Sequence, residues 1–270
     1  MFLALRQHWP EYLIEAWALG AFMVSAVLFT TLLEYPGSPV PELIPNGAAR
    51  RALIGLAMGL TAGALIYSPW GQQSGAHMNP ATTLTFLSLG KIQPWDAAFY
   101  IASQFIGGVC GVLLVKLLLR AIIAHPSVSY VATVPGPAGA GVAFIAEMAI
   151  SCGMMSMVLF VTNTPGIARY AGLFAGTLVF LYITFEAPLS GMSINPARTV
   201  ASALPSGIWT SGWVYWTAPA IGMLLAAQIY RRVNDSFPRA CPKLHHGTKQ
   251  RCIFCGHPGD PPAFARGSGR

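Results

Sequence analysis

The chain has 270 residues, of which 54% are hydrophobic and only 9% are charged, and its formal net charge is +7. Soluble domains usually contain about 25% charged residues, so this composition excludes an ordinary soluble protein and predicts a protein embedded in a lipid bilayer. The Met1–Pro10 start does not have the layout of a signal peptide, so we expect the first apolar segment to remain as a membrane helix.

Six apolar segments are long enough to cross a bilayer, because a spanning helix needs roughly 20 residues. In chain order they are about Tyr12–Leu33, Ala52–Ser68, Trp95–Leu119, Gly139–Val161, Ile167–Ala187 and Ile208–Tyr230. Two further stretches, Asn79–Leu89 and Asn195–Leu204, are too short to span. Each starts with Asn-Pro, a favoured helix cap followed by a favoured first helical residue. The predicted fold class is an all-α membrane protein with six transmembrane helices and two re-entrant half-helices.

The two half-helices begin in repeated blocks, Ser74–Ala81 and Ser190–Ala197, which share the pattern Ser-Gly-x-x-x-Asn-Pro-Ala. We therefore expect two similar halves, about residues 10–120 and 139–232, within a channel domain of residues 1–235. Each half would hold three spans, and an odd number forces the second half to be inverted relative to the first. Inverted repeats place their shared site near the bilayer midplane, between the N-termini of broken helices. The candidate site consists of both boxes: Asn79, Pro80, Ala81, Asn195, Pro196 and Ala197.

The distribution of Lys and Arg predicts the orientation in the membrane. Six spans put both termini on one side, and most Lys and Arg residues then share that side, many of them in the tail of residues 236–270. By the positive-inside rule, both termini are expected in the cytoplasm. The positive charge is thus mainly a topology signal. Nucleic acid is not expected as a partner, since there is no folded basic domain to bind it.

Together these features resemble the aquaporin, or major intrinsic protein, family. The match extends over about Tyr12–Tyr230 and includes both Asn-Pro-Ala boxes, Arg198 directly after the second box, and the paired carboxylates Glu15 and Glu147. The resemblance implies an inverted-repeat channel for water and other small uncharged solutes, with protons and ions excluded at the boxes. It implies no enzymatic activity, no cofactor for transport and a homotetramer in the lipid bilayer. We expect a bacterial-type member in the inner (cell) membrane.

The physics of the paired boxes suits such a channel. The N-terminus of each half-helix carries roughly +0.5 of an elementary charge from its aligned peptide dipoles, so two facing ends repel cations. The amides of Asn79 and Asn195 would orient water molecules in opposite directions on the two sides, which interrupts a proton wire. One such box would more simply be a helix cap, but two matched boxes favour a pore.

The resemblance also implies an outer constriction that contains Arg198. A cation at membrane depth must face water or a partner, and a structural pair with Glu186 or a carbonyl is the alternative. Alignment places Ile183 and Met192 in the same constriction, together with Met58, or Gly59 if no gap is allowed. Water-selective members typically have an aromatic residue and a histidine in this ring. This chain has neither, so glycerol, ammonia or a metalloid remains the alternative to water.

Position 199 points back toward water. Glycerol-conducting members usually carry Asp directly after the arginine, whereas this chain has Thr199. Glu15 and Glu147 could form a proton relay, but their matched places in the two halves favour a structural role, in which each accepts hydrogen bonds from the backbone of a re-entrant loop.

The C-terminal tail contains a cluster of potential metal ligands outside the family resemblance: Cys241, His245 or His246, Cys252 and Cys255. Four such ligands would suit a small structural zinc site, and the alternative is a basic tail with unrelated thiols. A regulatory tail on a metal- or redox-sensing membrane protein is a further possibility. Since every expected pore element precedes the tail, we expect transport not to require it.

Overall fold

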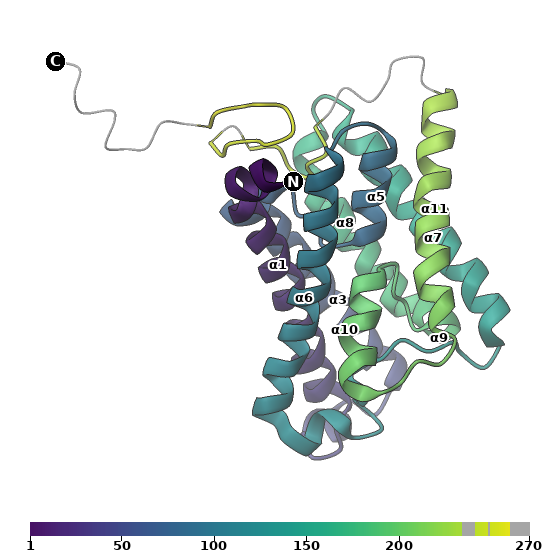
Figure 1. The fold of residues 1–270 in the computed structure, drawn as a ribbon. Coiled ribbons are helices and arrows are strands. Elements are labelled where there is room, and N and C mark those ends of the chain that lie inside the picture. Colours follow the sequence, from purple (N-terminus) through teal and green to yellow (C-terminus); the bar gives the residue numbers. More distant parts are fainter. Residues whose placement is uncertain (234–240, 248, 260–270) are drawn as a thin grey trace.

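The computed structural model describes residues 1–233, 241–247 and 249–259, and every regular element within these ranges is a helix (Figure 1). The long helices of the first half are α1 (Phe2–Glu34), α3 (Gly47–Tyr67) and α6 (Pro94–Leu119). Those of the second half are α7 (Gly139–Thr162), α8 (Ala171–Leu181) and α11 (Gly212–Val233). The two expected half-helices are α5 (Pro80–Ser88) and α10 (Pro196–Ser206).

Several short elements connect these helices. The short α-helices are α2 (Val40–Leu43), α4 (Pro69–Ser74) and α9 (Ala187–Ser190). The 3₁₀ turns are η1 (Arg120–Ala124), η2 (Ser129–Val131) and η3 (Ala168–Tyr170), and a π-helical turn, η4 (Tyr182–Glu186), extends α8 into α9. Helices α4 and α9 lead into the short loops that precede the two Asn-Pro-Ala boxes.

By length and composition alone, five helical segments in the described part of the chain could cross a membrane. They are Phe2–Glu34, Gly47–Tyr67, Pro94–Ala124, Gly139–Thr162 and Ala168–Ser190. The sixth expected span corresponds to α11, which has 22 residues and packs along α7. Its Trp, Tyr, Pro and Gln residues make it less apolar than the other five, although its length is sufficient.

The long helices pack in pairs. Helix α1 packs on α6 in the first half, α7 packs on α11 in the second half, and α3 and α8 pack on each other. Each half-helix makes most of its helix contacts with the last long helix of the other half: α5 with α11, and α10 with α6. The halves are therefore interlocked, because neither half-helix could keep its packing if the two halves separated.

Close helix crossings depend on glycine. A Cβ atom on Gly107 of α6 would lie 2.0 Å from the carbonyl oxygen of Ala16 in α1, and a Cβ on Gly176 of α8 would lie 2.5 Å from the carbonyl oxygen of Gly59 in α3. No side chain fits at such distances. Small residues at helix crossings let backbones approach closely, which is how membrane helices gain packing energy without a hydrophobic driving force.

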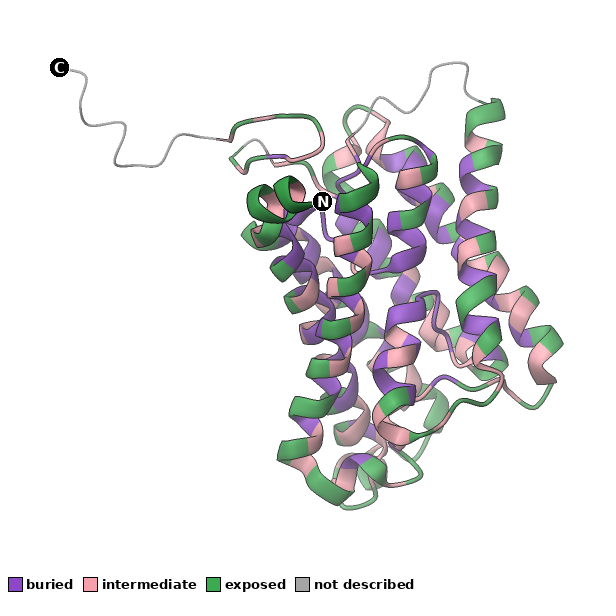
Figure 2. Ribbon diagram, in the orientation of Figure 1, coloured by how far each residue is buried: buried purple, intermediate pink, exposed green. Residues whose placement is uncertain are grey.

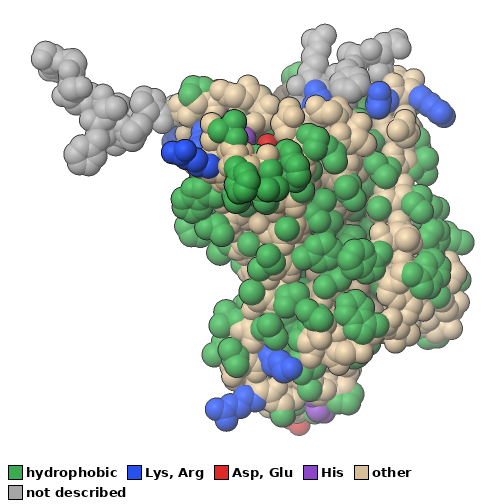
Figure 3. All heavy atoms as spheres, in the orientation of Figure 1, with side chains coloured by type: hydrophobic (Ala, Val, Ile, Leu, Met, Phe, Trp, Pro, Cys, Tyr) green, Lys and Arg blue, Asp and Glu red, His purple; other side chains and the backbone are tan. Residues whose placement is uncertain are grey.

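The outside of the helix bundle is apolar. The side chains of Leu117, Phe160 and Phe185 are among the exposed ones. Exposed positions recur along the outer helices of the bundle (Figure 2). In the face seen in Figure 3, hydrophobic side chains cover the middle of the molecule and the Lys and Arg side chains lie toward its two ends. Exposed leucine and phenylalanine at this density are stable only in contact with lipid, as expected for a membrane protein.

Both ends of the described chain lie on one side of the bundle. Arg251 of the tail donates hydrogen bonds to Gln7 and Glu11 near the start of α1. This agrees with an even number of membrane crossings between them.

Replacing Gly107 with Ala should destabilise the protein by about 1–3 kcal/mol, because the new methyl group overlaps backbone atoms of α1 that cannot move aside. The matched control is Gly141→Ala in α7, where a Cβ would meet no atom within 4 Å. That control should be neutral or stabilising by up to about 1 kcal/mol, since Ala favours helix over Gly. Thermal unfolding in detergent measures both. Equal melting temperatures for the two variants would contradict the close crossing.

Candidate functional site

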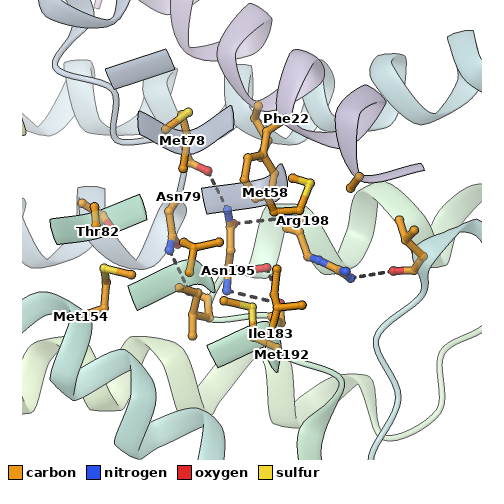
Figure 4. A pocket seen from close by; sticks show the side chains of 18 of the residues that line it. Phe22, Met58, Met78, Asn79, Thr82, Met154, Ile183, Met192, Asn195 and Arg198 are labelled. Atoms are coloured by element: carbon orange, nitrogen blue, oxygen red, sulfur yellow. Dashed lines mark hydrogen bonds between the residues drawn. The ribbon is translucent and has the colours of Figure 1, made fainter. Parts of the chain in front are cut away.

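The N-termini of α5 and α10 meet at two asparagine side chains from opposite halves (Figure 4). Asn79 Nδ2 donates to the carbonyl oxygen of Ile194 at 2.7 Å, and Asn195 Nδ2 donates to the carbonyl oxygen of Met78 at 2.7 Å. Each asparagine thus binds the residue that precedes the other asparagine. The two expected midplane residues lie together, joined by reciprocal hydrogen bonds.

Each asparagine also caps its own half-helix. Asn79 Oδ1 accepts from the backbone N–H of Ala81 at 2.9 Å, and Asn195 Oδ1 accepts from Ala197 and Arg198 at 3.0 and 3.2 Å. These bonds satisfy N–H groups that have no partner inside the helix. Because the side-chain oxygen is occupied, the amide nitrogen points away from the helix, toward the other loop and the cavity.

The proline and alanine of each box form the first turn of its half-helix. Pro80 and Pro196 occupy the first helical positions, where their missing N–H costs nothing. Ala81 and Ala197 are completely buried, so any larger side chain there would push the half-helix out of place.

The loops before the half-helices have a strained backbone of the same form in both halves. Ala76 and Met78 have φ angles of 53° and 49°, and their counterparts Met192 and Ile194 have 49° and 49°. A left-handed conformation is an outlier for a β-branched residue such as Ile194. Strain of this kind persists only where the surroundings enforce it, and it marks functional sites.

The paired carboxylates hold these loops in place. Glu15 accepts from Ser74 Oγ and from the backbone N–H groups of His77 and Met78, at 2.7–3.0 Å. Gln104 Nε2 adds a further bond to Glu15 at 2.8 Å. Glu15 is therefore surrounded by donors from the re-entrant loop and from α6.

Glu147 makes the equivalent bonds in the second half. It accepts from Ser190 Oγ and from the backbone N–H groups of Ser193 and Ile194, at 2.6–2.8 Å. Both carboxylates are completely buried. The contacts of Glu147 therefore match those of Glu15, residue type for residue type at the serine and position for position at the backbone N–H groups.

A cavity of about 290 Å³ lies around the two asparagines. Its lining includes all four side chains that the sequence analysis assigned to the constriction: Met58, Ile183, Met192 and Arg198 (Figure 4). Gly59, the alternative to Met58, instead faces the backbone of Gly176 in α8.

Arg198 is held by a carbonyl group. Its Nη1 donates to the carbonyl oxygen of Val131 in η2 at 2.8 Å, and the carboxylate oxygens of Glu186 have no hydrogen-bond partner among the described residues. The arginine therefore keeps its charge facing the cavity instead of neutralising it in an ion pair.

The tail brings four of its five candidate ligands together. Ligand atoms of Cys241, His246, Cys252 and Cys255 all lie within 4.8 Å of one another. The cysteines are free thiols, with Cys241 Sγ and Cys252 Sγ 3.2 Å apart. His245 lies elsewhere, with its ring 5.1 Å from that of Tyr67. Of the two histidines that the sequence left open, His246 lies beside the three cysteines.

The contact between tail and pore was not expected from the sequence. Leu244 is among the residues that line the cavity, so the described tail is not separate from the pore elements. Arg251 forms an ion pair with the buried Glu11 at 2.6 Å, and this hydrogen bond raises the pKa of Arg251. No spacing or repeat signals these contacts, since neither Leu244 nor Glu11 has a counterpart in the duplication.

His77 is a further residue that the sequence analysis did not select. Its Nδ1 lies 3.1 Å from Thr83 Oγ1, and its Nε2 lies 2.6 Å from the carbonyl oxygen of Pro242 in the tail. Ser193 and Thr199 occupy the equivalent places in the second half, with their hydroxyl oxygens 2.6 Å apart. Comparison of the blocks Ser74–Ala81 and Ser190–Ala197 could have singled out His77, because the second block has Ser193 at that position.

Comparisons with known proteins agree with this architecture. A sequence model of the family described as "Major intrinsic protein" matches residues 7–230. Aquaporin NIP2-3 of Zea mays is 35% identical over 220 residues, which cover 80% of this chain and 70% of the maize protein. Aquaporin A of Dictyostelium discoideum is 34% identical over 191 residues, 69% of this chain and 67% of that protein.

The fold is also that of a solved channel. The structure of the aquaglyceroporin from Plasmodium falciparum superimposes with a TM-score of 0.68, covering 83% of this chain and 96% of that chain at 21% sequence identity. At this low sequence identity, the structural similarity supports the fold and nothing more. The family match and the relatives, together with the interlocked half-helices, show that this chain belongs to the major intrinsic protein family, a family of membrane channels and not of enzymes.

Proposed function

We propose that this protein is a passive channel that conducts water, and other small uncharged solutes, while it excludes ions and protons. The observation that carries the proposal is the reciprocal pair of hydrogen bonds by which Asn79 and Asn195 join the two half-helix N-termini inside a cavity. The name of the maize relative, an aquaporin, supports the same solute class.

The arrangement suits a neutral hydrogen-bonding solute. An amide nitrogen carries two donors, and for each asparagine the structure shows one of them bound to a backbone carbonyl. The second donor of each can bind a passing water oxygen. The two helix ends each contribute roughly +0.5 of an elementary charge, so a cation, including hydronium, meets repulsion at the same point.

The constriction favours a second candidate, a broader range of neutral solutes. Met58, Ile183 and Met192 present apolar and partly flexible side chains opposite the single charge of Arg198. Such a ring suits a solute with one polar and one apolar face, such as glycerol, ammonia or a neutral metalloid. Water remains the first candidate because Thr199 stands where glycerol-conducting members usually carry Asp.

We further propose that the channel lies in a bacterial inner membrane as a homotetramer with a pore in each subunit, and that both termini are cytoplasmic. The basic residues on the side of the tail support this orientation. The organisms of the maize and Dictyostelium relatives are eukaryotic, so the bacterial source rests on the sequence alone.

The tail cluster is proposed to hold a structural zinc ion through Cys241, His246, Cys252 and Cys255. Three thiolates and one imidazole form a common structural zinc set. The cluster combines two ligands from the stretch 241–247 with two from 249–259, as in sites where the metal itself orders a short chain. A redox-sensing role for the same thiols is the alternative.

Proteoliposomes that contain the purified protein, measured with a zinc chelator on both sides of the membrane, should shrink faster than empty liposomes after an osmotic jump, because water would cross through the cavity. Stopped-flow light scattering measures this rate, and a second jump with glycerol tests the broader solute range. Proton flux, followed with an entrapped pH dye, should not exceed that of empty liposomes. Water permeation equal to that of empty liposomes under every condition tested would refute the proposed function.

Replacing Arg198 with Val should raise glycerol permeability on the order of tenfold, the change that about 1.4 kcal/mol of barrier produces, because the constriction widens and loses its charge. Cation leakage should also increase. Arg198→Lys is the matched control, since it keeps the charge but lacks the planar group that reaches Val131. It should retain cation exclusion. If glycerol and cation flux were unchanged in Arg198→Val, this residue would not be part of the filter.

Purified protein should contain about one zinc ion per chain, and Cys252→Ser/Cys255→Ser should contain none, since two of four ligands are lost. Mass spectrometry of the metal content measures both. Cys110→Ser is the control, because Cys110 is an exposed thiol of α6 outside the cluster and its loss should leave the zinc content unchanged. Zinc that is absent from the wild type, or equal in the wild type and the double variant, would rule out the site.

A further inference from the structure

One tail residue reaches into the wall of the pore. Leu244 lines the cavity and is only 7% exposed. It packs in the same apolar cluster as Ile66 of α3 and Ala175 of α8. We call this end of the cavity, where Leu244 lies, the tail-side mouth. The isobutyl group of Leu244 therefore occupies volume at this mouth that permeating water would otherwise fill.

Leu244 is held by backbone contacts to the first re-entrant loop. Its N–H donates to the carbonyl oxygen of Gly75 at 3.1 Å, and the carbonyl oxygen of Pro242 lies 2.6 Å from Nε2 of His77. The tail is thus bonded to the loop that ends in Asn79. Two main-chain groups of the tail are therefore bonded to this loop, the Leu244 N–H to a backbone carbonyl and the Pro242 carbonyl to the His77 side chain.

The residue before Leu244 is a buried cation. Lys243 is 2% exposed, and its Nζ donates to the carbonyl oxygens of Gln72 at 2.8 Å and Arg251 at 3.0 Å. One bond goes to α4 and the other to the tail itself. Burying an ammonium group is costly, so this position is stable only while the tail keeps its folded shape and supplies the second carbonyl.

The more distal part of the tail covers the same region from outside. Phe254 stacks on the ring of His77, with centroids 5.9 Å apart, and Arg251 pairs with the buried Glu11. Residues 249–259 therefore lie against α1 and the first re-entrant loop, and the yellow loop in Figure 1 lies beside the start of α1. They also contact residues 241–247, since the Arg251 carbonyl oxygen accepts from Lys243 Nζ. The position of residues 249–259 relative to residues 241–247 therefore depends on the contacts between these two stretches.

The metal ligands bracket the inserted residue. Cys241 comes three positions before Leu244 and His246 comes two positions after it, while Cys252 and Cys255 come from the covering stretch. An ion bound by all four would close a short loop with Leu244 at its tip and fasten that loop to the stretch that pairs with Glu11. Cys255 and His246 are exposed, so the ion can reach the site from solvent.

We propose that the tail stretches 241–247 and 249–259 form a zinc-dependent plug: with zinc bound at Cys241, His246, Cys252 and Cys255, Leu244 closes the tail-side mouth, and loss of zinc releases these stretches and opens the channel. This inference rests on the proposed channel function and on the proposed zinc site. It assigns the zinc a regulatory effect on transport in addition to a structural one.

Zinc binding would shift the equilibrium between the released and the seated form of the tail toward the seated form. The segment is too short to have a core of its own, so the ordered form depends on its ligands and on the body of the protein. Zinc binds only the assembled ligand set. Free zinc at about ten times its dissociation constant therefore favours the seated form by roughly tenfold over the metal-free balance.

The test measures water permeability of the full chain in proteoliposomes, with buffered free zinc or with a zinc chelator on both sides of the membrane. A phosphine reductant is present throughout, so that a disulfide between Cys241 and Cys252 cannot replace the metal. Chelation should raise water permeability by up to about tenfold. Zinc content and trypsin cleavage after Lys243 are followed in the same samples, since release of the segment should expose this buried lysine.

Two variants separate the metal from the plug. Cys252→Ser/Cys255→Ser should be permeable, and cleaved by trypsin, whether or not zinc is added. Leu244→Ala should still bind about one zinc ion, since Leu244 is not a ligand, but should have high permeability with zinc present. Cys110→Ser, outside the cluster, should behave like the wild type.

The outcomes distinguish the linked proposals. If wild-type protein binds zinc but its permeability and its cleavage after Lys243 are the same with chelator, the plug is wrong and the zinc site stands. If the chain binds no zinc, both are wrong. If neither chelated wild type nor the double variant conducts water, the channel function fails, and the plug with it.

Discussion

The need to satisfy backbone polar groups inside an apolar bundle is the constraint on which the rest of this structure depends. The two loops that precede α5 and α10 end inside the apolar bundle. In lipid, every N–H or carbonyl group without a hydrogen-bond partner destabilises the protein by several kcal/mol. Glu15 and Glu147 take up the N–H groups of these loops, and Asn79 and Asn195 bind a carbonyl of the opposite loop. The groups that build the pore are therefore the same groups that make the loops stable.

This coupling explains why the two halves cannot act separately. Helix α5 depends on α11, and α10 depends on α6, while each asparagine requires the other loop as its acceptor. Close crossings at Gly107 and Gly176 bring the long helices near enough for the half-helices to meet between them. Strain at Met78 and Ile194 persists because carboxylate, asparagine and helix packing all hold the same geometry.

The departures from duplication carry the features that are specific to this chain. The first block has His77 where the second has Ser193, and the first half-helix has Thr82 where the second has Arg198. Arg198 places a charge at one end of the cavity, held by Val131. His77 faces the other direction, where it contacts Pro242 and Phe254 of the tail. A symmetric scaffold thus gives two different mouths.

The sequence by itself determined the membrane class, the all-α fold and the starts of the two half-helices, because hydrophobic length and Asn-Pro caps are local signals. The repeated block also predicted two halves that share a central site. The sequence also narrowed the constriction to Met58 or Gly59 beside Ile183, Met192 and Arg198. In the tertiary structure Met58 lines the cavity, whereas Gly59 faces α8. Only the tertiary structure could select His246 over His245, pair Arg198 with Val131 and bring Leu244 into the pore wall. These contacts join residues that are far apart in sequence or depend on the direction of a single side chain, and no local pattern encodes either.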